Sequence, residues 1–223
     1  MKLVSEKYCL NIPIEETVVN VICIENKDIL SGFVRDVLSQ IDGNYSEFIV
    51  EENEKNINFA KYVECITSPF LLDINNKKII TKLYKEINEN AVDNLTDKTV
   101  EINSMILNYL DNLICNQTYP LEYEVDINVI DILKMYNVRI AVEETTLAEN
   151  MLNYIKFMKR ICGLKVFFLI NIKQYFKQEE LLCIYKECLY EKINIILVES
   201  SYNDSYDYEK IWIIDKDLCI IEP

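Results

Sequence analysis

The sequence contains no histidine and only three glycines, Gly32, Gly43 and Gly163. Without an imidazole, the chain cannot form a Ser-His-Asp or Cys-His catalytic arrangement, nor a zinc site that needs a histidine ligand. With so few glycines, it also lacks the glycine-rich loop that cradles nucleotide phosphates. These absences exclude several common classes of enzyme.

The sequence also lacks the features of an exported or membrane protein. The eight cysteines are scattered and no two have CxxC spacing, and the opening residues MKLVSEKYCL contain no apolar signal-peptide core. No apolar run approaches the length that crosses a bilayer. We therefore expect reduced thiols and a cytoplasmic protein that has no membrane partner. At 223 residues, half of them hydrophobic, the chain fits one large domain or one domain with an insertion.

Hydrophobic patterning predicts an α/β fold interrupted by a pair of helices. KVFFLI (165–170) and INIILV (193–198) are wholly apolar strands around a helix over 178–190, which is typical of a parallel βαβ unit buried on both faces. The α/β head is expected to comprise residues 1–72 and 119–223, and the helical leg residues 73–118. Further strands are expected at 2–12, 16–24, 59–66, 121–127 and 138–142, with a closing edge hairpin formed by 211–214 and 218–221. Helices are expected at 26–41, 75–90, 98–115, 129–137 and 147–162.

Positive charge is unevenly distributed in a chain whose formal charge is −14. Residues 150–178 contain no Asp or Glu, and helical spacing places several of their cations opposite the apolar side of the helix. A second acid-free window, residues 74–85, carries lysines at i, i+4 and i+7. These windows predict two surfaces that contact nucleic-acid phosphates without reading base sequence, although solvated basic helix faces are the alternative. The candidate DNA-binding residues are Lys156, Lys159, Arg160, Lys165, Lys78, Lys82 and Lys85.

Alternating carboxylates suggest a site for a hard divalent cation. Glu122, Glu124 and Asp126 share one face of the expected strand 121–127, and Asn128 and Asp131 follow at once. A set of oxygen ligands favours calcium, magnesium or manganese over zinc. The same acids could instead form the exposed polar face of an edge strand, or the centre of a metal-dependent nuclease.

Taken in order, the segments of the chain resemble a known family over nearly the whole length. The segments are PFLLDINNKKIITKLYKEI (69–87), LEYEVDI (121–127), KVFFLIN (165–171), INIILVES (193–200) and IIDKDLCII (213–221). They resemble the short CRISPR-associated adaptation protein of type II-A loci, the "Csn-two" family.

This resemblance implies a head with a nucleoside-triphosphatase-like fold that has lost its nucleotide site, a helical leg, and a ring of four subunits. It further implies binding of double-stranded DNA ends without sequence preference, a calcium-dependent assembled form, and no known catalysis. The implied role is acquisition of new spacers alongside the effector nuclease and integrase subunits of the locus. In this family's pattern, Glu124 and Asp126 fall on the acidic calcium segment, and Lys159, Lys165 and Lys82 fall on basic positions. A protein-interaction module without DNA affinity is the remaining alternative.

Overall fold

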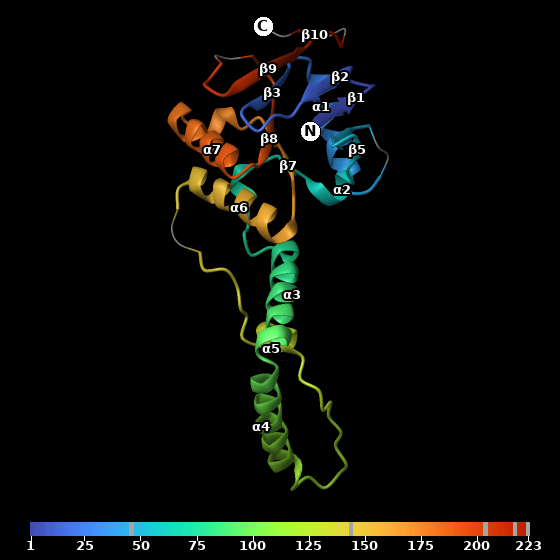
Figure 1. Cartoon of the computed structure of the whole chain (residues 1–223), viewed down its shortest axis with the longest axis vertical. Coiled ribbons are helices and arrows are strands. Elements are labelled where there is room, and N and C mark those ends of the chain that lie inside the picture. Colours follow the sequence, from blue (N-terminus) through green and yellow to red (C-terminus); the bar gives the residue numbers. More distant parts are fainter. Residues whose placement is uncertain (45–46, 143–144, 203–204, 216–217, 222–223) are drawn as a thin grey trace. The chain divides into compact units, whose positions relative to one another are not determined.

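A computed structural model of the chain describes residues 1–44, 47–142, 145–202, 205–215 and 218–221. The chain divides into two compact units, which are residues 1–74 with 143–223, and residues 75–142 (Figure 1). The second unit is longer than the helical leg expected at 73–118, because it also contains residues 119–142.

The first unit is built on a mostly parallel sheet, which has six strands within the described residues, in the order β10-β9-β3-β8-β7-β6. β3 pairs in parallel with both β8 and β9, β7 pairs in parallel with β6 and β8, and β10 is antiparallel to β9. The expected parallel βαβ unit and the closing edge hairpin are therefore confirmed. Numbered along the chain, the parallel strands follow the spatial order 5-1-4-3-2. Their bounds are β3 (Val19–Ile24), β6 (Val63–Ile66), β7 (Val166–Ile170), β8 (Asn194–Glu199), β9 (Glu209–Ile214) and β10 (Ile220–Ile221).

Both faces of this sheet are covered, which explains why its strands are continuously apolar. On one face lie α1 (Lys27–Ile41), α2 (Phe59–Tyr62) and a small antiparallel sheet, and the core there is centred on Phe33, Phe48 and Phe168. The other face is covered by α6 (Leu147–Cys162) and α7 (Gln178–Tyr190), as Figure 1 shows. The small sheet has the order β2-β1-β4-β5, with bounds β1 (Lys2–Ser5), β2 (Leu10–Pro13), β4 (Ile49–Glu52) and β5 (Lys55–Asn56).

The second unit consists of helices joined by irregular chain. Its helices are α3 (Lys77–Asn94), α4 (Thr96–Ile114) and α5 (Val129–Met135). α5 is held to α3 by Tyr84, whose hydroxyl lies 3.3 Å from the carbonyl of Leu133 in α5 and donates to the carbonyl of Val138, just after α5, at 2.8 Å. Asn75, just before α3, both donates to and accepts from the backbone of Ile140, at 3.0 and 2.9 Å.

Two expected strands are wrong, because residues 121–127 and 138–142 form no strand. A strand needs a neighbouring strand to satisfy its backbone groups, and these segments lie beside helices. Isolated side-chain contacts hold them instead, such as the 2.8 Å bond from Asn103 Nδ2 to the carbonyl of Val125.

Two other expected strands are shorter than predicted. The expected strand 2–12 folds back as the β1–β2 hairpin. The expected strand 59–66 begins as α2, since Asn58 caps that helix through the backbone N–H of Lys61. Short 3-10 turns, η1 (Pro69–Leu71) and η2 (Lys173–Tyr175), complete the elements. Among the described residues, no helix is both long enough and apolar enough to pass through a membrane.

Candidate nucleic-acid interface

α6 carries the densest group of predicted DNA-binding residues. The helix starts at a capping box formed by Thr146 and Glu149, and it ends at Gly163, whose φ of 73° suits glycine. Met151 and Ile155 are fully buried on its sheet-facing side. The helical periodicity therefore turns the cations of α6 away from the core.

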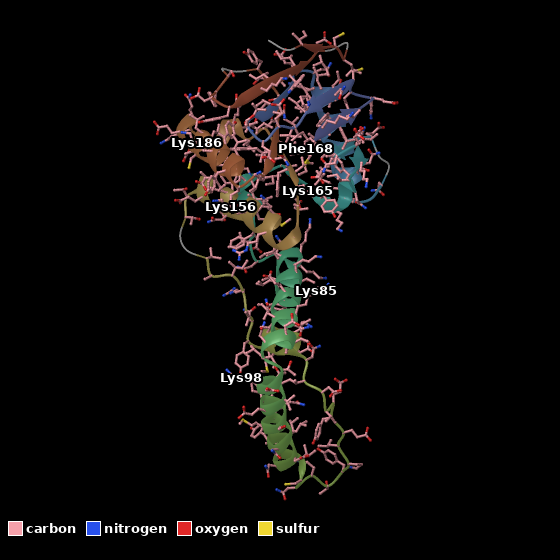
Figure 2. All side chains as sticks on the ribbon, viewed as in Figure 1. Lys85, Lys98, Lys156, Lys165, Phe168 and Lys186 are labelled. Carbon is pink, nitrogen blue, oxygen red and sulfur yellow. The ribbon has the colours of Figure 1, made fainter. Side chains whose placement is uncertain are left out.

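The α6 cations differ in how they are engaged. Lys156 Nζ lies 2.6 Å from Glu187 Oε2 on α7, and both side chains are partly buried (Lys156 is labelled in Figure 2). Lys159 is half-buried and donates to the backbone carbonyls of Glu191 and Lys192, just after α7. Arg160 is exposed, and within the described ranges no hydrogen bond or ion pair engages it.

Two further lysines lie where parallel strands begin. Lys165 precedes β7 and pairs with the Glu52 carboxylate, and its ammonium lies 5.2 Å from the centre of the Tyr62 ring. Lys192 precedes β8 and pairs with Glu16 at 2.9 Å. Because the amino ends of parallel strands meet at one edge of a sheet, both lysines line the same cavity of about 440 Å³, together with Lys159.

These contacts define a basic edge, which comprises Lys156, Lys159, Arg160, Lys165 and Lys192 at the amino-terminal side of the main sheet. Its positive charge is compensated by acids that are distant in sequence. Glu16, Glu52 and Glu187 all lie outside the acid-free window 150–178, yet each contacts a cation of the basic edge. The local field is therefore weaker than the sequence window alone implies.

The other predicted DNA-binding surface lies on α3, which belongs to the second unit. Lys78, Lys82 and Lys85 are all exposed, whereas Ile79 and Tyr84 are buried on other sides of the helix. Lys85, labelled in Figure 2, lies 3.7 Å from Glu89 one turn further along. Such an exposed i, i+4 pair contributes little energy and leaves the ammonium accessible.

The predicted metal ligands do not converge. Glu122, Glu124 and Asp126 are exposed on irregular chain, so the strand that was expected to align their side chains is absent. Asn128 uses its side-chain oxygen to cap α5, accepting from Ile130 N at 2.9 Å, and Asp131 accepts from Lys134 Nζ at 2.8 Å. In the described part of the chain, no three acidic, cysteine or histidine side chains gather as a metal site would require. As arranged in the described part of one chain, the five predicted ligands do not form a calcium site.

A comparison with protein-family models gives a match over most of the chain. The model described as "CRISPR-associated protein (Cas_Csn2)" matches residues 40–218. The chain belongs to this family. A search of curated proteins finds no match. The family match confirms the resemblance stated above and indicates a CRISPR-associated role, and it includes the α3 lysines, the acidic segment and all cations of the basic edge.

The opposite, carboxyl-terminal edge of the sheet in this Cas_Csn2 chain is occupied by its own polar groups. Only Glu25 and Asn26 separate β3 from α1, and the Asn26 side chain accepts from Asp28 N and Ile29 N at 2.9 and 3.2 Å. On the neighbouring strand β8, Glu199 pairs in register with Cys23 of β3. Ligands of open α/β sheets bind outside this edge, so these groups lie where a nucleotide would be expected.

Glu199 is buried, and its carboxylate accepts from the backbone N–H groups of Ile172 and Lys173 at 3.1 and 3.2 Å. Burial raises the pKa of Glu199 to about 7, against the opposing effect of those two donors and of the Lys173 charge. The Lys173 ammonium itself lies 2.7 Å from Glu209, whose buried side chain also accepts from the Tyr185 hydroxyl at 2.8 Å. The turn between β3 and α1 is too short to form a phosphate-binding loop. The backbone donors of Ile172 and Lys173 nearby are already bonded to Glu199.

Sequence reasoning missed Lys192 and the acids that pair with the basic edge. Lys192 could have been found, since it precedes a buried parallel strand just as Lys165 does, and the amino ends of such strands lie together. Nothing in the sequence pairs Glu52 with Lys165, because their proximity results from the packing of the small sheet beside the main one.

Proposed function

We propose that this Cas_Csn2 family chain binds double-stranded DNA without reading its sequence and takes part in CRISPR adaptation, the acquisition of new spacers. The observation that carries the proposal is the basic edge, where cations from α6 and from the starts of β7 and β8 gather in a chain of net charge −14. Lysine and arginine groups of this kind contact phosphates and carry no base specificity. The exposed lysines of α3 supply a second set of phosphate contacts.

We infer a non-catalytic role for the α/β unit. The parallel strand order 5-1-4-3-2, with β3 central and followed directly by α1, supports a nucleoside-triphosphatase-like head. The two-residue turn after β3 supports loss of the nucleotide site, because it has no glycine and no length to enclose a phosphate. The nuclease alternative needs converging carboxylates, and Glu122, Glu124 and Asp126 give it no support.

Assembly into a homotetrameric ring is supported by the outer side of α4. None of this fully described helix is buried. One side contacts the chain at 119–127, through Asn103 with Val125 and through Asp111 with Tyr123. The other side presents an apolar stripe at i, i+3, i+4, i+7 and i+11. An exposed stripe of this kind is typical of a subunit interface. The stripe comprises Ile102, Met105, Ile106, Tyr109 and Leu113.

Double-stranded DNA ends and the effector nuclease and integrase subunits of the same locus are the partners that this role requires. The eight cysteines, each within the described ranges, form no disulfide, which agrees with action in the cytoplasm. We propose no calcium site within a single chain, because the predicted ligands do not converge. Measuring the assembly's mass with calcium and with a chelator tests whether the ion acts at the level of the assembly.

Gel shifts on linear and on closed circular duplexes of the same sequence test the proposal. A ring that threads DNA from its ends binds the linear form and not the circle, and equal binding of both would exclude threading. The logarithm of the binding constant should fall with the logarithm of salt concentration by about 0.9 per phosphate neutralised. A salt-independent affinity, or no affinity for duplex DNA at all, would overturn the proposed function.

A further inference from the structure

We propose that Glu16, Glu52 and Glu187 are built-in competitors for DNA phosphates, each occupying a cation of the basic edge until a phosphate displaces it. The inference rests on the proposed function and deepens it, because it specifies what limits affinity at that surface. It also adds Lys192 to the phosphate contacts.

The geometry of the basic edge carries this inference. Lys156, Lys165 and Lys192 lie in three different segments of the chain. Each pairs with a carboxylate from another segment: Glu187, Glu52 and Glu16, respectively. The acids lie on α7 (Glu187), at the end of β4 (Glu52) and ahead of β3 (Glu16). All of these residues belong to the first unit, so each pairing exists within one compact part of a single chain.

Each carboxylate does for its lysine what a phosphate oxygen would do. Both are anionic oxygen acceptors that bind an ammonium at hydrogen-bond distance, so one lysine cannot serve both fully. Binding DNA therefore exchanges one ion pair for another, and the negative charge of the released acid remains beside the bound phosphate. Both effects lower affinity, and both disappear when the acid is made neutral.

Solvent exposure predicts which acid matters most. The side chains of Lys156 and Glu187 are 33% and 44% exposed, and those of Lys165 and Glu52 are 36% and 32% exposed. Lys192 and Glu16 are 69% and 64% exposed, so water screens that pair more. The Glu187 and Glu52 pairs should therefore oppose DNA more strongly than the Glu16 pair.

The test compares Glu→Gln variants with one matched control. Glu187→Gln, Glu52→Gln and Glu16→Gln each remove one negative charge and keep the shape of the side chain. Glu179→Gln is the control, because Glu179 is exposed on the same helix as Glu187, eight residues earlier, and it forms no ion pair among the described residues. Fluorescence anisotropy with a labelled linear duplex of 30 base pairs, at several salt concentrations, gives the dissociation constant of the full chain.

Glu187→Gln and Glu52→Gln are expected to tighten binding by roughly two- to fivefold at low salt, the range that exchange of a partly exposed ion pair allows. Glu16→Gln is expected to have a smaller effect, and Glu179→Gln to remain within error of the wild type. A gain by Glu179→Gln equal to the others would show a general charge effect and overturn the inference. Equal affinities of the wild type and the Glu187→Gln and Glu52→Gln variants would also overturn it.

Failure of the inference is distinguishable from failure of the proposed function. If the wild type binds duplex DNA with the expected salt dependence and the acid variants do not differ from it, only the competition is wrong. If neither the wild type nor any variant binds duplex DNA, both are wrong. Thermal unfolding of each variant verifies that it is folded, and single substitutions at partly exposed pairs should shift the midpoint little.

Discussion

Lys156 on α6 and Glu187 on α7 form an ion pair across two helices that cover the same face of the main sheet, with 2.6 Å between Nζ and Oε2. The pair belongs to a surface that is rich in cations and yet holds its own counter-ions. Arg160, one turn further along α6, is exposed and lies beside the same hollow as Lys156 and Lys159. Among the described residues, its removal therefore leaves neither an acid nor a backbone carbonyl without its partner.

Replacing Arg160 with glutamine should weaken binding to duplex DNA. One lost phosphate contact reduces the salt slope by about 0.9 and lowers affinity by roughly five- to tenfold at 0.1 M salt. The loss should be equal for duplexes of unrelated sequence. Lys98→Gln, on exposed α4, is the control of equal charge change, and it should have at most a small effect. An unchanged slope in the Arg160 variant would remove this residue from the interface.

Replacing Lys82 and Lys85 with glutamine should test the α3 surface separately. Both lysines are exposed, so the double variant should unfold at the wild-type temperature while its DNA affinity falls. We expect a salt slope lower by about 1.8 than that of the wild type, one increment for each lost contact. Lys134→Gln, whose lysine pairs with Asp131, is a control in the same unit that removes one positive charge. Wild-type affinity of the double variant would remove Lys82 and Lys85 from the DNA interface.

Replacing Tyr109 with lysine should dissociate the assembly without unfolding the chain. Tyr109 lies on the apolar stripe of α4 with 64% of its surface exposed, so a charge there is costly only when another subunit covers it. Light scattering should give a mass near four chains for the wild type and a lower multiple for the variant. Ser104→Lys, on the other side of α4, should keep the wild-type mass. A wild type that is monomeric at all concentrations would contradict the ring.

Glu199 should make the first unit less stable as pH rises. Its pKa is near 4.5 in the unfolded chain and about 7 in the folded one, so the folded state holds the proton more tightly. That contribution is fully present below about pH 4.5 and is lost as pH rises through 7, with a magnitude on the order of 3 kcal/mol in the free energy of unfolding.

Denaturant unfolding of the wild type and of Glu199→Gln at pH 5, 6, 7 and 8 checks this. Glutamine keeps an oxygen that can accept from Ile172 N and Lys173 N but cannot ionise. The stability of the variant relative to the wild type should therefore increase with pH. A difference between the two proteins that does not depend on pH would show that Glu199 is already ionised at pH 5.

Replacing Asn20 with alanine should destabilise the fold by about 1–3 kcal/mol. Asn20 is buried in β3, where its side-chain oxygen accepts from Trp212 Nε1 at 2.8 Å and its nitrogen donates to the Pro13 carbonyl at 3.0 Å. Alanine leaves the buried indole N–H without an acceptor. Asn11→Ala, at an exposed position of β2, should cost far less in the same denaturant titration.

The elements that were predictable from sequence are those with strong local signals. α6 spans the predicted residues because Thr146 and Glu149 form a capping box, apolar residues recur at helical spacing, and Gly163 permits the left-handed end. β7 and β8 were recognisable because an apolar strand buried on both faces has no polar interruption. A strand was predicted at 121–127 because polar and apolar residues alternate there, as they do in a half-buried strand. In the part of the chain that the structure describes, no neighbouring strand lies beside this segment to pair with it.

Four of the five cations of the basic edge were predicted from the sequence, whereas Lys192 and the electrostatic surroundings of the edge were not. Periodicity placed Lys156, Lys159 and Arg160 on the outward side of α6. It could not show that Glu187 would be packed against Lys156, since that depends on how α7 lies beside α6. Charge counted along a window therefore overstates charge at a surface whenever distant segments supply acids.

The polar network at the carboxyl edge of the main sheet also bears on engineering this fold. Inserting a glycine-rich turn between β3 and α1 would not by itself create a nucleotide pocket. An incoming phosphate would meet the Glu199 carboxylate on the adjacent strand, and the N–H groups of Ile172 and Lys173 are already committed to that carboxylate. A nucleotide pocket at this edge would therefore require changes both in the turn and at Glu199.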